Sequence, residues 1–77
     1  MPTVFTQNGF RFFFYSNEHT PIHVHVRNGD GEAVFEIQEE VALLESVGLK
    51  TQELNAAERL AEEHKKLIVQ KWHEYFD

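Results

Sequence analysis

The sequence predicts an α+β domain, a curved antiparallel sheet of four to five strands with one long C-terminal helix packed on one face. Asn-Gly pairs at 8–9 and 28–29 predict two turns between strands, since both residue types tolerate the positive φ of tight hairpins. Apolar residues in the last third recur at helical spacing, which predicts an amphipathic helix. We expect a single domain over residues 1–77, mostly strands in 1–47 and helix in 51–76.

The first Asn-Gly pair lies between two runs that favour strands. Residues 3–7 form a short β-leaning segment, and residues 10–15 form a return strand rich in phenylalanine. A two-residue turn places Val4 opposite Phe13 in this hairpin. Both faces are partly aromatic, so we expect at least one to be buried and the other not to be freely solvated.

Strict alternation of apolar and polar residues predicts a third strand over residues 22–27. Its apolar residues would face a core, and its polar residues, among them His23 and His25, would share the opposite face. A four-residue turn leads to a fourth strand at 32–38. This register places Glu36 opposite His23 and keeps apolar pairs together on one face.

The segment before the helix has no clear period. Residues 41–47 are only partly apolar, and we interpret them as a short fifth strand or an extended connector. Gly48 ends this segment. Thr51 is the expected N-cap of a helix over residues 52–75, whose apolar stripe must lie on the sheet.

Composition limits the classes of function. The chain has no cysteine, so disulfides and thiolate sites are excluded. No apolar run reaches the roughly 20 residues of a membrane span, and no signal peptide heads the chain. We therefore expect a cytoplasmic protein without membrane contacts.

The net charge of −6 is unevenly placed. Residues 32–77 carry five basic and eleven acidic groups, whereas residues 1–31 are neutral and hold Arg11 and Arg27. An acidic chain is a poor general binder of phosphate backbones, so nucleic acid is a weakly supported partner. An anionic ligand would bind in the first half.

Residues 16–27 gather most of the side chains that can carry chemistry, including three of the five histidines. His23 and His25 could act in general acid–base catalysis, because histidine titrates near neutrality. Glu18 could orient either ring, and Arg27 could stabilise developing negative charge. These four residues are the candidate catalytic group, and each also has a structural role open to it.

The same histidines could instead hold a metal. Side chains at i and i+2 of a strand point the same way, so His23 and His25 could reach one ion, with His19 or Glu36 as a third ligand. A divalent transition metal such as zinc is thus the candidate cofactor, and none is required by the sequence. The alternative is a pair of exposed strand histidines, with His23 paired to Glu36.

Alternation also assigns an aromatic and aliphatic patch to the sheet face away from the helix. Phe13, Tyr15, Val34 and Val4 fall on this face, and Arg11 lies beside them. Apolar residues with a polar rim are typical of an interface, so these are the candidate partner-binding residues. A cognate protein or a second copy of the chain would bury the patch.

The motif Tyr-Ser-x-Glu-His-x-Pro-x-His-Val-His at 15–25, with the aromatic strand before it and the Trp-His-Glu-Tyr-Phe end of the helix, resembles one small family. The family is known as domain of unknown function 4160, and the resemblance runs essentially end to end. Its signature positions fall on Glu18, Pro21, His23 and His25. The resemblance implies a small cytoplasmic bacterial protein whose gene lies beside a second small gene, in pairs proposed as toxin–antitoxin-like modules. It implies no reaction.

We therefore expect a component of a toxin–antitoxin-like module that acts by binding a cognate protein partner. The first alternative is a histidine-based nuclease or other hydrolase, with or without metal. The second alternative is a structural or regulatory adaptor.

Overall fold

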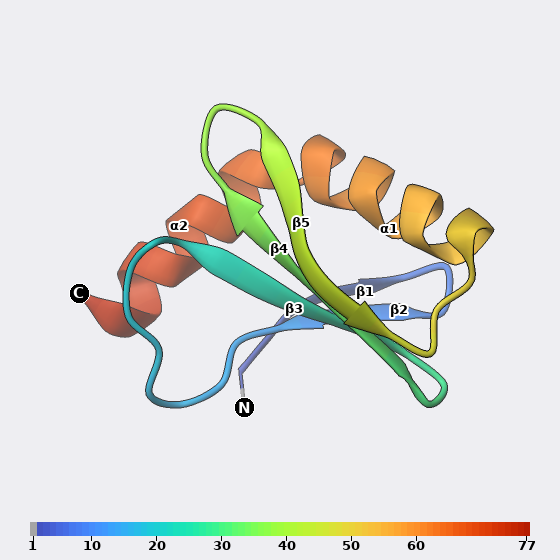
Figure 1. Ribbon diagram of the computed structural model, residues 1–77. Coiled ribbons are helices and arrows are strands. Elements are labelled where there is room, and N and C mark those ends of the chain that lie inside the picture. The colour runs from blue at the N-terminus through green and yellow to red at the C-terminus, as the bar shows by residue number, and fades with distance from the viewer. Residues whose placement is uncertain (1) are drawn as a thin grey trace.

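A computed structural model describes residues 2–77, which form an antiparallel sheet of five strands with two helices on one face (Figure 1). The expected α+β class is confirmed, and the ambiguous segment before the helix is the fifth strand. The elements are β1 (Thr3–Gln7), β2 (Phe10–Phe13), β3 (His23–Asn28), β4 (Gly31–Ile37), β5 (Val41–Val47), α1 (Thr51–Glu63) and α2 (Lys65–Phe76).

Every strand pairs with its neighbours in sequence, in the order β1-β2-β3-β4-β5. The Asn-Gly turn between β1 and β2 forms as predicted, with φ of 53° at Asn8 and 82° at Gly9. The register beyond it differs, because an irregularity between Thr3 and Phe5 places Thr3 opposite Phe13. The predicted pairing of Val4 with Phe13 is therefore wrong, and Val4 packs against the core on the helix side instead.

The pairing of β3 with β4 follows the predicted register, with His23 opposite Glu36. At the start of β4, Gly31 lies against the backbone of Gly48, where the chain leaves β5. A Cβ atom on Gly31 would lie 2.6 Å from the Gly48 carbonyl oxygen, so only glycine fits. This close approach lets β5 end beside the start of β4 and the chain turn towards α1.

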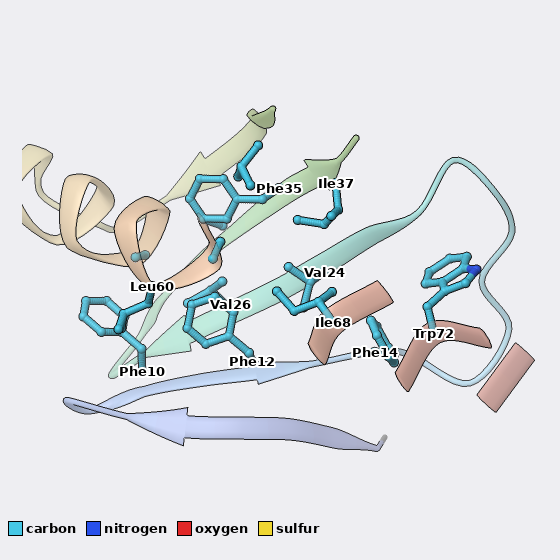
Figure 2. Packing of buried hydrophobic residues seen from close by; sticks show 14 residues of the cluster. Phe10, Phe12, Phe14, Val24, Val26, Phe35, Ile37, Leu60, Ile68 and Trp72 are labelled. Atoms are coloured by element: carbon cyan, nitrogen blue, oxygen red, sulfur yellow. The ribbon is translucent and has the colours of Figure 1, made fainter. Parts of the chain in front are cut away.

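The helices cover the face of the sheet that carries most of the aromatic residues (Figure 2). α1 contacts β4 and β5, and α2 contacts β1. Trp72 of α2 packs edge-on against Phe14 at a ring distance of 5.5 Å. The largest fully buried side chains of this core are Phe12, Phe14, Phe35, Ile68, Val24 and Val26.

The predicted single helix is divided at His64, which separates α1 from α2 and has φ of −106° and ψ of 20°. A straight helix over residues 51–76 would be about 39 Å long, at 1.5 Å per residue. The longest dimension of the molecule is 34 Å. The His64 ring lies 4.3 Å from that of Phe5, tilted by 45°, and its Nε2 lies 3.0 Å from Gln7 Oε1, so the bend is held by β1. The bend allows both halves to follow the curved sheet.

Neither helix in residues 2–77 combines the length and the apolar character that crossing a membrane requires.

Candidate functional site

Glu18 lies between two histidines on the sheet face opposite the helices. Its Oε1 atom is 2.8 Å from His23 Nε2 and 2.6 Å from His25 Nε2. The side chains are only 8% (Glu18), 18% (His23) and 11% (His25) exposed. Alternation along β3 places both imidazoles on this face, and the loop between β2 and β3 brings the carboxylate to them.

The loop that carries Glu18 is held by short local contacts. Glu18 Oε2 accepts a hydrogen bond from the Tyr15 backbone N–H at 3.1 Å, which turns the chain back over the sheet. The Thr20–Pro21 peptide bond in this loop is cis. Trp72 lies beside the loop (Figure 2), with its ring 5.2 Å from that of His23. The cluster therefore joins β3, the loop and α2.

The hydrogen-bond geometry assigns the tautomer of His23. Its Nδ1 atom lies 2.7 Å from the Pro21 carbonyl oxygen, which can only accept, so Nδ1 carries a hydrogen. In the neutral ring, Nε2 then presents a lone pair to the Glu18 carboxylate oxygen. Two acceptors at this distance need a positive charge between them, either a proton or a metal ion.

A second carboxylate, that of Glu32, lies beside the cluster on the same face of the sheet. Glu32 accepts hydrogen bonds from the Tyr15 hydroxyl at 3.3 Å and from the Arg27 guanidinium at 2.7 Å. The bond from Arg27 lowers the pKa of Glu32, and the same contact raises the pKa of Arg27. Burial, followed by the charge of Glu32, raises the pKa of Tyr15.

The remaining nitrogen of His25 points towards this second carboxylate. Its Nδ1 atom is buried and has no hydrogen-bond partner among residues 2–77. The nearest acidic atom is Glu32 Oε2, 3.7 Å away. A buried ring nitrogen without a partner is uncommon and costs free energy.

Phe13 and Val34 are the buried apolar side chains of this face. Phe13 is fully buried and Val34 is 9% exposed, so the predicted partner-binding patch lies beneath other side chains. The His25 ring stacks on Phe13 at 5.6 Å, Tyr15 packs edge-on at 5.3 Å, and the Arg11 guanidinium lies 4.7 Å above the ring centre. Arg11 and Tyr15 of that patch are half-buried and keep accessible surface on this face, whereas the half-buried Val4 lies on the helix side.

Beside the imidazoles lies a shallow hollow of about 330 Å³. It is lined by Pro21, His23, His25, Val34, Leu44 and Glu45. The sequence did not indicate the last two residues. The register shifts in the pairing of β4 with β5, between Val34 and Phe35, where Leu44 has no partner on β4. Such an irregularity has no clear signal in a segment whose strand assignment was itself ambiguous.

The structure brings together a different third ligand from those predicted. Glu36 lies opposite His23 on the ladder, but its carboxylate accepts a hydrogen bond from Gln38. His19 is exposed and shares a shallow hollow with the C-terminal residues of α2. Glu18, predicted as a catalytic residue, is the carboxylate that meets both imidazoles. Three residues suit a metal ion by donor distance, namely Glu18, His23 and His25.

One comparison with known proteins identifies a family, and none adds an activity. No curated protein and no solved structure matches this chain. A family model described as domain of unknown function (DUF4160) matches residues 9–73, which include all of the site. The expected family is thereby confirmed: the chain belongs to the DUF4160 family.

Proposed function

We propose that this protein is a component of a small two-gene, toxin–antitoxin-like module and acts by binding a cognate protein along β5. One observation carries the proposal. The large apolar side chains exposed among residues 2–77 are Tyr75 and three on β5, where Leu43 is 43%, Leu44 53% and Val47 72% exposed.

β5 is well suited to strand pairing. It is a terminal strand of the sheet, and β4 is its only strand neighbour in the part of the chain that the structure describes. Edge strands present unpaired backbone N–H and C=O groups, and proteins commonly protect them with charges or proline. β5 has seven residues and a single charge, Glu45, so an extended segment of another chain can pair with it.

The surroundings of β5 select the chemistry of the partner. Glu39 and Glu40 lie exposed in the turn before the strand, and Glu45 is exposed on it. The chain as a whole carries a net charge of −6. An extended partner segment with alternating apolar and basic residues matches this strand, because its basic residues would meet the carboxylates. A second copy of this acidic chain matches less well.

Co-expression with the product of the adjacent gene tests the proposal. Size-exclusion chromatography with light scattering should show a one-to-one complex for the wild type. Leu44→Lys/Val47→Lys should weaken that complex at least tenfold. Tyr75→Lys is the matched control, because it replaces an apolar side chain of similar exposure, 48%, away from β5.

Two results would contradict this function. One is a wild-type protein that stays monomeric with the neighbouring gene product. The other is a complex that the β5 variant and the Tyr75→Lys control form equally well. A concentration-dependent homodimer that the β5 variant abolishes would assign the edge to a second copy instead.

A histidine-based hydrolase is the second candidate function. The hollow beside His23 and His25 favours it, since a substrate there would meet both rings. Val47→Lys separates the two functions, because Val47 lies on β5 but does not line the hollow. Partner binding should fall in this variant, whereas a reaction in the hollow should not.

A further inference from the structure

We propose that Glu18, His23 and His25 bind one divalent first-row transition metal ion, with Zn²⁺ as the reference ion. This inference does not rest on partner binding. The three residues offer one carboxylate oxygen and two imidazole nitrogens that all lie within 4.8 Å of one another. Two histidines and one carboxylate are a donor set that zinc and non-haem iron sites use.

The donor distances fit a metal centre. With metal–ligand bonds of about 2.05 Å, neighbouring donors lie about 2.9 Å apart in an octahedral site and about 3.4 Å apart in a tetrahedral one. Glu18 Oε1 is 2.8 Å from His23 Nε2 and 2.6 Å from His25 Nε2. Each of these two contacts is shorter than either metal-bound spacing by less than 1 Å, so a small outward shift of each histidine from the carboxylate would admit an ion.

His23 is already held in the tautomer that a metal needs. Its Nδ1–H donates to the Pro21 carbonyl oxygen at 2.7 Å, which leaves the Nε2 lone pair directed at the centre of the cluster. A backbone carbonyl that orients a ligating imidazole is a common outer contact of metal sites.

His25 supplies the second argument. With Nε2 on a metal, the ring carries its hydrogen on Nδ1, the buried atom that has no partner among residues 2–77. That hydrogen would face Glu32 Oε2, 3.7 Å away, and a small ring shift would form a carboxylate–histidine–metal contact. The metal thus gives a role to a nitrogen that the other contacts leave unused.

Protons alone leave one atom of the cluster without a partner. A protonated His23 and a neutral His25 that donates from Nε2 account for every hydrogen bond of the two rings. The buried Nδ1 atom of His25 then has no partner among residues 2–77. A divalent ion would engage all four ring nitrogens with both rings neutral.

Three protein ligands leave coordination positions for water or a ligand. Both histidines also line the hollow beside β5, together with Leu44 and Glu45. A small anionic or hydroxyl-bearing ligand would have access to the ion from this side.

The test is calorimetric titration of the chelator-treated full chain with ZnCl₂, together with Co²⁺ absorption spectra. Wild type should bind one ion, and Co²⁺ should give d–d bands typical of nitrogen and oxygen ligands. His25→Ala and Glu18→Ala should each weaken binding at least 100-fold. His19→Ala and His73→Ala are matched controls, because both histidines are exposed outside the cluster, and they should bind as wild type does.

Glu32→Gln keeps the proposal falsifiable if the ligand variants fail to fold. Glu32 contacts none of the three metal-donor atoms and approaches the cluster at Nδ1 of His25. The Glu32→Gln variant should weaken Zn²⁺ binding about 10- to 100-fold. Zinc should also raise the melting temperature of the wild type and not that of folded His25→Ala. Equal, weak zinc uptake by wild type, His25→Ala and Glu32→Gln would overturn the proposal.

Discussion

The two faces of the sheet are buried by different means. The helix face is covered by α1 and α2, and its core consists of aromatic and aliphatic side chains. No helix covers the opposite face within residues 2–77, yet Phe13 there is as fully buried as Phe12 on the helix face. Its cover consists of Arg11, Tyr15 and His25.

The comparison shows that a small domain can bury a second layer with polar side chains if these pair with one another. His25 meets Glu18, and Tyr15 and Arg27 meet Glu32. Buried polar groups are stable only when their hydrogen bonds are made, so this layer depends on protonation and ligands. Among residues 2–77, the fully buried core of the helix face contains no polar or charged side chain and has no such dependence.

Removing a large side chain from the helix face should have the largest effect. Phe35→Ala should lower the free energy of unfolding by about 3–5 kcal/mol, because it leaves a cavity among fully buried neighbours. Urea unfolding followed by circular dichroism measures the change. Thr6→Ala, at an exposed strand position, is the control. A loss below about 1 kcal/mol would mean that this face is not a packed core.

Removing one charge from the polar face should cost less. Glu18→Gln should lower the free energy of unfolding by about 1–3 kcal/mol in the presence of a chelator, because its contacts to two histidines lose their charge. The same urea measurement applies, with the exposed Glu40→Gln as control. Equal stability of the two variants would show that the cluster does not hold this face together.

The smallest effect concerns pH. Arg27 holds the pKa of Glu32 below its usual 4.5, so this contact stabilises the fold above about pH 4.5 and loses its effect as the pH falls through the lowered value. At pH 7 the free energy of unfolding of the wild type should exceed that of Glu32→Gln by up to about 1 kcal/mol. This difference should shrink below about pH 4.5. Thermal melts from pH 3 to 7 measure it, and parallel curves would contradict the assignment. Glu40→Gln, which removes an exposed carboxylate in the turn before β5, is the control.

The strands could be predicted because their signals are local. Alternation over β3 and the turn residues on both sides determine which side chains face the helices, and the register of β3 with β4 follows. The irregularities at Val4 and Leu44 could not be predicted, because an extra residue in a strand depends on how neighbouring strands curve. The bend at His64 likewise depends on contacts with β1, more than fifty residues earlier.

The structure brings together Glu18, His23 and His25, whereas the sequence analysis grouped His23 and His25 with His19 or Glu36 as metal ligands. Sequence alternation identified His23 and His25, whereas strand pairing suggested Glu36 as the third ligand. The actual neighbour, Glu18, comes from an irregular loop that the Tyr15 N–H turns back, and loop conformation has no periodic signal.

The bend at His64 has a consequence for how the chain is made. Each strand pairs with its sequence neighbour, so the sheet can form as it is synthesised, from β1 to β5. The helices follow last, and His64 reaches back 57 positions to Gln7 only when synthesis is nearly finished. Until then the aromatic face around Phe12 and Phe35 is open to other chains. A chain truncated after β5 should therefore expose the aromatic face of its sheet and be prone to aggregate.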